Sequence, residues 1–366
     1  MNANILAPIG GVEVNLLEIG RELAHRGHTI DLAYLVDGMY RDDYSAFCPS
    51  LRQVRGFSFS RRQALADLRR IIPSAWAASR KRPDVVYVNQ INEIVYGAMA
   101  SRLARTPLIC HLHGCVASGV SPRLATQVDR FVAVSRYVSD YWLAAGVAPD
   151  RLAVVHNGID PAAYPPGGVA ERSEARERLG LPEEGFVALY YGRIDPDKGV
   201  EVLLDAWGKL QGDLDVGRLL LVGSPSVHQN PAYLQSLHDR APAGCHWLPM
   251  QRDVLTPLHA ADVVVLPAMW AEPFGRVIVE TLSTGRPVVA SRTGGIPEIL
   301  NGPFERFLTE PGDAGALAKH LRELVEWRRH EPQLAAACTA LVTDRFTLAN
   351  TVDKTEGILL DVLHGP

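Results

Sequence analysis

Short apolar runs alternate with amphipathic stretches along most of the chain. Runs of this length that are rich in Val, Ile and Leu are typical of strands buried on both faces. Between them, apolar residues recur at helical spacing, as over Val14–Arg26 and Gly199–Lys209. Strands that alternate with helices in this way predict an α/β fold with parallel sheets. The predicted strands are Ala3–Ala7, Thr29–Val36, Val85–Asn89, Leu108–His111, Phe131–Val134, Leu152–His156, Val187–Tyr191, Leu219–Val222, Cys245–Leu248, Val263–Pro267 and Val288–Ala290.

The number of predicted strands and the length of 366 residues both exceed what one domain with one sheet usually holds. We therefore predict two domains. The stretch DPAAYPPGG, residues 160–168, is rich in Pro and Gly and lacks apolar periodicity, which is typical of a linker. This places the first domain at residues 1–160 and the second at residues 161–345.

Composition and charge argue against several classes of protein. No apolar run approaches the roughly 18 residues of a membrane-spanning helix, and the start of the chain lacks the pattern of a secretory signal. The five cysteines are scattered, which favours free thiols in a reducing compartment. The net charge of −4 argues against a dedicated nucleic-acid binder. We expect a cytoplasmic protein.

The segment 52–82 differs from the rest of the chain in charge, with nine Lys/Arg and a single acid, Asp67. Four apolar residues recur within it at helical spacing: Leu65, Leu68, Ile72 and Trp76. The simpler interpretation is a helix with a solvated basic face and its apolar side packed on a core. The alternative is peripheral contact with an anionic lipid surface or with a phosphorylated acceptor.

Glycines and cations lie where predicted strands end and helices begin, the place at which α/β sheets bind ligands. Gly10 and Gly11 follow the first strand, and glycines there let N–H groups approach an anion. In YYGRIDPDKG, Arg193 and Lys198 follow the strand Val187–Tyr191 and precede a helix. Two cations in this place suit a diphosphate.

The stretch CHLHG also ends a strand and places two histidines, His111 and His113, on one face of it. No second pair of ligands accompanies them at the spacing of a structural zinc site, so we interpret His113 as lining a binding site. The glycines of TGGIPEIL, residues 293–300, repeat the order of strand, glycines and helix. Their N–H groups can serve an anion or sugar hydroxyls, and no metal site is predicted.

The stretch WAEPFGRVIVE, residues 270–280, holds two carboxylates. Proline and glycine interrupt the helical pattern after Glu272, so this residue lies in a loop and the helix begins near Gly275 or Arg276. The first N–H groups of that helix are then unpaired and available to a ligand. Glu280 lies on the second turn, where a carboxylate can hold a vicinal diol.

Together these motifs resemble the retaining glycosyltransferases of family 4, whose GT-B architecture consists of two facing Rossmann-like domains with parallel sheets and an interdomain cleft. The resemblance covers nearly the whole chain and is specific because of the order and spacing of its motifs. These are GGVE (10–13), LHG (112–114), VSRYVSDYW (134–142), VVHNGID (154–160), GRIDPDKG (192–199), EPFGRVIVE (272–280) and TGGIPE (293–298).

The resemblance implies that a sugar is transferred from a nucleotide-sugar, UDP- or GDP-linked, to an acceptor hydroxyl with retention of configuration. It implies no metal and no cofactor, the nucleotide-sugar being a co-substrate. The implied catalytic residues are His113, Arg193, Lys198 and Glu272. The implied donor-binding residues are Gly11, Arg193, Lys198, Met250, Gln251, Glu272, Phe274, Gly275, Arg276, Val277 and Glu280, with Glu280 on the ribose and Met250 and Gln251 near the base.

The resemblance also implies that the final helix, within residues 346–366, returns to the first domain. That domain would bind the acceptor: a small molecule, a saccharide or a lipid-linked sugar. The predicted acceptor residues are Gly10, Gly11, Asn89, Asn92 and His113. Contact through residues 52–82 would place the protein at the inner face of a membrane.

Three other functions compete with this one. A glycoside hydrolase could use Glu272 and Glu280 as acid and base, but it leaves Arg193 and Lys198 unexplained. A nucleotide-sugar epimerase can share the GT-B frame, and an inactive sugar-nucleotide-binding protein could keep the same residues. A nicotinamide oxidoreductase is disfavoured because the chain contains no G-x-G-x-x-G fingerprint.

Overall fold

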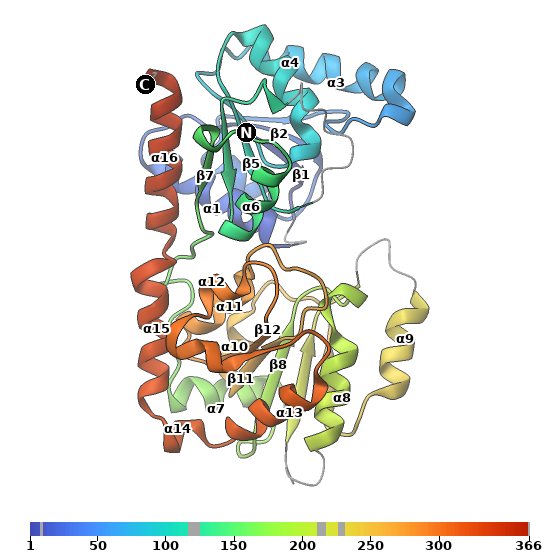
Figure 1. Cartoon of the computed structure of the whole chain (residues 1–366), viewed down its shortest axis with the longest axis vertical. Helices are drawn as coiled ribbons and strands as arrows, with labels where there is room; N and C mark the ends of the chain where they lie inside the picture. The colour runs from blue at the N-terminus through green and yellow to red at the C-terminus, as the bar shows by residue number, and fades with distance from the viewer. Residues whose placement is uncertain (8–9, 116–124, 211–216, 226–230, 365–366) are drawn as a thin grey trace. The chain divides into compact units, whose positions relative to one another are not determined.

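The computed structural model describes residues 1–7, 10–115, 125–210, 217–225 and 231–364, and the chain divides into two compact units (Figure 1). Unit 1 comprises Met1–Asn157 together with Leu348–Pro366, and unit 2 comprises Gly158–Thr347. The chain therefore passes from unit 1 into unit 2 and returns to unit 1 with its last helix. In the part of the chain that the structure describes, no helix is long and apolar enough to cross a bilayer.

Unit 1 contains two parallel sheets, ordered β1-β2-β3 and β4-β5-β6-β7. Their strands are β1 (Asn2–Ile5), β2 (Asp31–Val36), β3 (Ser50–Gln53), β4 (Val86–Val88), β5 (Leu108–Leu112), β6 (Arg130–Ala133) and β7 (Leu152–Val154). The helices are α1 (Gly11–His25), α2 (Arg41–Ser45), α3 (Ala64–Ser79), α4 (Ile94–Ala104), α6 (Arg136–Ala144) and α16 (Leu348–His364), with 3₁₀ turns η1 (Arg61–Gln63), η2 (Ile91–Glu93) and η3 (Pro149–Arg151).

The side chain of Asn2 links the two sheets of unit 1. Its amide oxygen accepts from the backbone N–H of Asn89, just beyond β4, at 3.3 Å. Its amide nitrogen donates to Glu93 at 2.7 Å. Because Asn2 is fully buried, these bonds replace water that the amide would otherwise need.

The last helix, α16, packs on α1 within unit 1. Arg26, at the end of α1, donates to Asp353 at 2.7 Å and to Glu356 at 2.8 Å. His28 lies 2.7 Å from the same Glu356. Apolar residues of the two helices share one core beneath these polar bonds, so α16 is an integral part of this unit.

Unit 2 contains one six-stranded parallel sheet, ordered β10-β9-β8-β11-β12-β13. Its strands are β8 (Val187–Tyr191), β9 (Arg218–Val222), β10 (Cys245–Leu248), β11 (Val263–Leu266), β12 (Val288–Ser291) and β13 (Leu308–Thr309). Its helices are α7 (Val169–Arg178), α8 (Val200–Leu210), α9 (Pro231–Arg240), α10 (Leu255–Ala260), α11 (Arg276–Ser283), α12 (Ile296–Ile299), α13 (Ala314–Glu323), α14 (Trp327–His330) and α15 (Gln333–Arg345), with η4 (Pro196–Lys198) and η5 (Gly302–Phe307).

The predicted strands correspond to observed strands, with bounds that differ by no more than two residues. Two observed strands were not predicted. β3 reads SLRQ and lies at the edge of its sheet, where polar residues are tolerated, and β13 is two residues long. Both therefore lack the apolar run by which the other strands are recognised.

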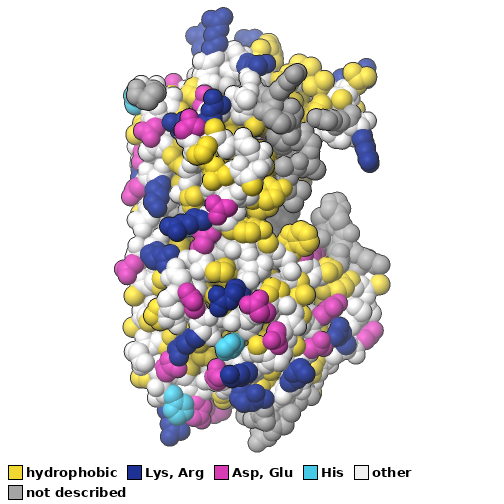
Figure 2. Space-filling view, viewed as in Figure 1, with side chains coloured by type: hydrophobic (Ala, Val, Ile, Leu, Met, Phe, Trp, Pro, Cys, Tyr) yellow, Lys and Arg dark blue, Asp and Glu magenta, His cyan; other side chains and the backbone are white. Residues whose placement is uncertain are grey.

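Helix α3 corrects the simpler interpretation of segment 52–82. Its buried face is formed by Asp67, Ile71, Ser74 and Ala75. The apolar stripe faces solvent instead: Leu65 is 77% exposed, Ile72 48% and Trp76 54%. Figure 2 shows hydrophobic side chains beside Lys and Arg side chains over this helix. The small side chains on the buried face allow α3 to lie close against α4.

The stretch 160–168, predicted to be a linker, is a packed part of unit 2. The hydroxyl of Tyr164 donates to Glu280 at 3.2 Å, and its carbonyl accepts from the Ser283 hydroxyl at 2.8 Å. The carbonyl of Pro165 lies 3.0 Å from the His259 ring nitrogen. The prolines here fix the route of a segment that the rest of the unit holds in place.

Candidate active site

The loops that follow β8 and β11, together with helix α11, carry most of the residues predicted to bind the donor, and the loop after β12 lies beside them. Backbone hydrogen bonds join these loops at the carboxyl edge of the six-stranded sheet. Asp197 O accepts from Met269 N at 2.9 Å, and Glu272 O accepts from Gly295 N at 2.8 Å. The side chains of this edge are therefore carried by a backbone that is held in place from one loop to the next.

Two glycines allow the loops to approach so closely. A Cβ on Gly199 would lie 1.9 Å from the carbonyl oxygen of Pro267, and a Cβ on Gly294 would lie 2.0 Å from that of Glu272. Their φ angles are 70° and 59°, a left-handed conformation that costs other residues about 1–2 kcal/mol. A side chain at either position would push apart the loops that present the candidate site.

The structure brings Lys198 and Glu272 together. The Lys198 ammonium lies 2.7 Å from the Glu272 carboxylate, and the two side chains are 17% and 18% exposed. Asp197 lies farther from the same ammonium, at 3.7 Å. Opposite charges that are partly shielded from water attract each other and hold each other in a fixed orientation.

Arg193 lies on the same loop as Lys198 but is paired differently. Its guanidinium lies 2.5 Å from Asp195, and the side chain is more exposed, at 38%. The carbonyl of Arg193 accepts a hydrogen bond from the buried Tyr190 hydroxyl. The backbone at Arg193 is thus anchored, while the cation has room to turn toward a ligand.

Glu280 is buried and surrounded by donors. One carboxylate oxygen accepts from Arg276 at 2.6 Å and from the Tyr164 hydroxyl at 3.2 Å. The other accepts from the Tyr191 hydroxyl at 2.7 Å. Burial and the neighbouring Glu280 raise the pKa of Tyr191, so its hydroxyl remains a donor. The longest of these bonds, from Tyr164, is the one that a ligand hydroxyl would replace with least loss.

Helix α11 begins at Arg276, as the sequence predicted, after Gly275 in a left-handed conformation with φ 96°. Phe274 is buried against Phe346, with ring centroids 5.9 Å apart. The carbonyl of Val277 accepts from the Tyr191 hydroxyl at 3.2 Å. The start of α11 and the carboxylate of Glu280 are therefore held against the end of β8.

Met250 and Gln251, predicted to lie near the base, follow β10 at the same edge of the sheet. The backbone N–H of Met250 lies 3.3 Å from the hydroxyl of Ser224, which follows β9. The Met250 side chain is 40% exposed. Both residues are partly exposed, and the described hydrogen bonds and ion pairs do not join them to the Lys198–Glu272 pair.

In unit 1, the structure brings together His113 and Asn89, which follow β5 and β4. The His113 Nε2 atom lies 3.1 Å from the Asn89 side-chain oxygen. An amide oxygen only accepts, so Nε2 carries the proton and Nδ1 is left as an acceptor. Burial lowers the pKa of His113 to about 3. The ring is therefore neutral near pH 7 and acts through hydrogen bonds, without positive charge.

Sequence analysis missed Glu93 in this region. Its carboxylate accepts from Asn2 at 2.7 Å and from the Gln90 N–H at 3.1 Å, and the residue is 1% exposed. Burial raises its pKa to about 7. Its sequence signal was present but weak: a Glu three residues after Gln90, at the start of a helical turn, as in a capping box.

The remaining residues predicted to bind the acceptor are more dispersed. Asn92 is exposed on η2. Gly10 precedes α1 in an extended conformation and Gly11 is its first residue. Of the five, the described hydrogen bonds join Asn89 and His113.

Family models account for both units. The model described as Glycosyltransferase Family 4 matches residues 9–163, and that described as Glycosyl transferases group 1 matches residues 171–339. The chain belongs to these glycosyltransferases and has the GT-B fold.

Several curated relatives of this glycosyltransferase carry the name D-inositol 3-phosphate glycosyltransferase. The relative from Acidothermus cellulolyticus is 28% identical over 97% of this chain and 86% of its own length. The relative from Catenulispora acidiphila is 29% identical over 87% of this chain and 82% of its own length. One from Mycobacterium tuberculosis is 35% identical over 57% of this chain and 43% of its own length.

Solved structures agree with this fold. Anabaena HepE in complex with UDP and glucose superposes with a TM-score of 0.84 at 25% identity, covering 98% of both chains. A glycosyltransferase from Rickettsia africae superposes with a TM-score of 0.84 at 19% identity, covering 100% of this chain and 98% of that chain. The second comparison bears on the fold alone.

Proposed function

We propose that this glycosyltransferase transfers a hexosyl group from a UDP-sugar to an acceptor hydroxyl, with retention of configuration and without a metal ion. The observation that carries the proposal is the Lys198–Glu272 pair, held at 2.7 Å on two loops whose backbones are bonded to each other. HepE, similar along 98% of both chains, has been crystallised with UDP-glucose. This supports UDP as the nucleotide and a hexose as the sugar.

In this proposal, unit 2 stabilises the charge that develops on the departing diphosphate. Lys198 and Arg193 face the phosphate oxygens, and positioned cations of this kind are a strong catalytic lever. They take the part that a divalent ion plays in other sugar-nucleotide sites. Glu272 holds hydroxyls of the sugar once Lys198 has moved to phosphate, and Glu280 holds those of the ribose in place of Tyr164.

Retention follows, in this proposal, from attack on the same face that the diphosphate leaves. The acceptor oxygen forms the new bond to the anomeric carbon as the bond to the phosphate oxygen breaks. The leaving phosphate oxygen takes the acceptor's proton, so no protein nucleophile is required. His113, neutral at pH 7, offers Nδ1 as an acceptor for a sugar or acceptor hydroxyl.

The experiment is a panel of UDP-, GDP-, ADP- and TDP-sugars with cyclitol, cyclitol phosphate and saccharide acceptors, in EDTA. D-inositol 3-phosphate is tested first because it appears in the names of the relatives. We expect acceptor-dependent release of UDP and a product whose anomeric configuration, read by NMR, matches the donor. Donor isomerised without acceptor would show an epimerase. Binding of UDP without turnover across the panel would show an inactive binder.

We also propose that α3 contacts an anionic lipid surface. Leu65, Ile72 and Trp76 form an exposed apolar stripe. Exposed basic side chains accompany it on the helix and at its end: Arg62, Arg69, Arg70, Arg80 and Lys81. The Arg80 guanidinium lies 4.9 Å from the centre of the Trp76 ring. An apolar face flanked by cations favours binding to anionic bilayers. Each Lys or Arg near the bilayer surface adds about 1 kcal/mol to the binding free energy.

Co-sedimentation with vesicles tests the lipid contact. We expect binding to phosphatidylglycerol vesicles that falls with salt and is absent on phosphatidylcholine. Ile72→Ser with Trp76→Ser should lower binding at least tenfold. The control is Leu360→Ser, an apolar residue of α16 with 41% exposure that lies outside α3. Equal binding by both variants would contradict the proposal.

A further inference from the structure

A second group of basic side chains lies at the opposite edge of the six-stranded sheet from Lys198. Asp262, just before β11, stands at its centre. Arg176 lies 2.9 Å from its carboxylate and Arg172 3.4 Å from it, and Arg328 is also paired with it. Arg286, just before β12, completes the group and donates to the carbonyls of Thr284 and, at 3.0 Å, His259.

The cations of this group outnumber the carboxylates. Asp262 is buried among them, while the other nearby acid, Glu171, is exposed and accepts from the backbone N–H of Gly168. The Nε atom of Arg286 is buried without a hydrogen-bond partner among the described residues, whereas the Nε atom of Arg172 has the Asp262 carboxylate 3.4 Å away. Arg286 is 1% exposed. A buried cation whose N–H groups lack acceptors costs free energy of folding unless another group supplies those acceptors.

Burial and the nearby Arg328 both lower the pKa of Arg286, to about 9. A guanidinium ordinarily stays charged well above that value. The shift has the direction expected for a cation that is surrounded by other cations and shielded from water. The lowered pKa of Arg286 indicates that an anion bound beside it would be stabilised.

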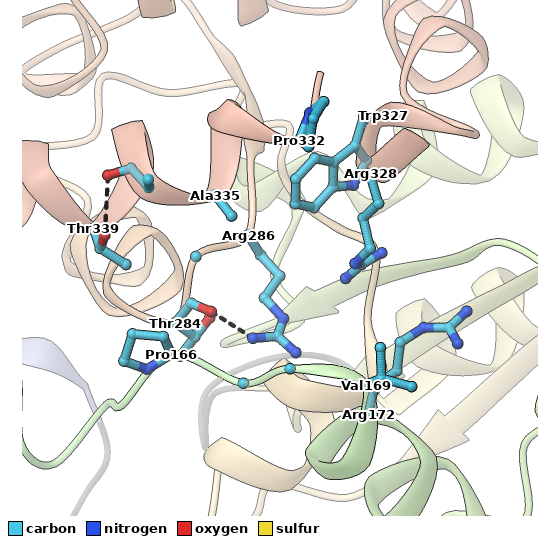
Figure 3. Close-up of a pocket in the computed structure, with 14 residues that line it drawn as sticks. Pro166, Val169, Arg172, Thr284, Arg286, Trp327, Arg328, Pro332, Ala335 and Thr339 are labelled. Atoms are coloured by element: carbon cyan, nitrogen blue, oxygen red, sulfur yellow. Dashed lines mark hydrogen bonds between the residues drawn. The ribbon is translucent and has the colours of Figure 1, made fainter. Parts of the chain in front are cut away.

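A cavity of about 390 Å³ opens beside these arginines. In Figure 3 the Arg286 side chain extends away from Ala335 toward Thr284 and Pro166, and the Arg328 side chain extends from beside Trp327 toward the side of the cavity that holds Arg172. Cations and apolar surface share the lining: Arg172, Arg286 and Arg328, with Trp327, Pro332 and Ala336. A volume of this size is within the range of small-molecule sites.

The start of α7 adds to the positive character of the cavity. Gly167, Gly168 and Val169 line it at the N-terminus of this helix, where backbone dipoles favour anions. A Cβ on Gly167 would come within 2.9 Å of the Arg286 guanidinium. Because Gly167 has no side chain, the buried Arg286 guanidinium has room beside it.

We infer that this cavity binds a small organic phosphate, with the phosphate oxygens on Arg286 and Arg172 and the apolar part of the ligand against Trp327 and Pro332. The site is distinct from the one proposed for the donor. It lies where β11 and β12 begin, whereas Glu272 and Gly294 follow the ends of the same strands. Helix α11 connects them, with Glu280 in its second turn and Thr284 at its C-terminal end.

The test measures binding of phenyl phosphate and inorganic phosphate by calorimetry at constant ionic strength. A Lys198→Ala background removes one of the two cations proposed for the donor site and leaves Arg193. Ala336→Glu places an acid at the cavity, on an exposed position of α15 that tolerates it. Ala337→Glu, exposed on the same helix and absent from the cavity lining, is the matched control.

We expect the Lys198→Ala protein to bind phenyl phosphate with higher affinity than inorganic phosphate. Ala336→Glu should weaken it at least tenfold, and Ala337→Glu by no more than twofold. Arg172→Gln, at a side chain that is 18% exposed, should weaken it about tenfold. Equal affinity in the two glutamate variants would overturn the inference, as would the absence of binding at about 10 mM ligand.

Discussion

Substitutions of Lys198 and of Glu272 should affect nucleotide binding differently: the first should weaken it, and the second should not. The ammonium and the carboxylate lie 2.7 Å apart, so a diphosphate must compete with Glu272 for Lys198. Lys198→Ala removes a charge-assisted contact worth about 1.5–3 kcal/mol and should lower kcat/KM by about 10- to 150-fold. Glu272→Gln removes the competitor. UDP should then bind as well as before or a few-fold more tightly, while turnover falls because the sugar hydroxyls lose the carboxylate that accepts their hydrogen bonds.

Calorimetry with UDP and a steady-state assay of UDP release measure both quantities in the two single variants and the double variant. Lys209→Ala, an exposed lysine in the last turn of α8, is the control and should leave both unchanged. The reasoning fails if Glu272→Gln weakens UDP as much as Lys198→Ala does. The pair would then be a structural bridge whose loss displaces both loops. A loss of turnover under threefold in Lys198→Ala would equally remove its role.

Three further predictions concern Glu93, Gly294 and Asp262. Burial raises the pKa of Glu93 to about 7, from an ordinary value of 4.5. Glu93 therefore contributes stability fully below about pH 4.5 and loses it as the pH rises through 7. Glu93→Gln should make the protein more stable than the wild type at pH 8 by on the order of 3 kcal/mol, and urea unfolding at pH 4.5 and 8 checks this. Gly294→Ala, whose Cβ would meet the Glu272 carbonyl at 2.0 Å, should lower both the unfolding temperature and activity. Asp262→Asn leaves its arginines uncompensated and should lower the free energy of unfolding by about 3–5 kcal/mol, measured by denaturant titration; a change under 1 kcal/mol would argue against a shared charge network.

Much of the fold was predictable because each central strand carries its own signal. The strand Val187–Tyr191 was predicted with its observed bounds, since it is a continuous apolar run between a glycine and a glycine turn. The environment of α3 was not predictable in this way. Helical spacing gives the face on which Leu65, Ile72 and Trp76 lie, but it does not say whether that face meets a core or solvent. Small residues on the opposite side, Ser74 and Ala75, decided it by allowing close packing on α4.

The sequence predicted that the candidate residues follow strands, and it did not predict how they pair. Lys198 and Glu272 each follow a strand, which the sequence shows, but their contact joins residues 74 positions apart. The donors around Glu280 were missed for a similar reason. Tyr191 is the last residue of a buried strand and Tyr164 lies in a stretch that resembles a linker, and neither pattern points to a carboxylate.

The arginine cavity was invisible in the sequence because it is built from the turn before β12 together with parts of helices α7, α14 and α15. Motif analysis of an α/β protein concentrates on the opposite edge, where ligands usually bind. Arg172, Arg286 and Arg328 lie on three segments that are far apart in the sequence and line one cavity. The same helix, α11, ends at this cavity and begins at the site of Glu280. A ligand that held Arg286 and the end of α11 would therefore act on the helix that also positions Arg276 and Glu280. Coupling between the two sites would then appear as a change in the KM for the donor when phenyl phosphate is added.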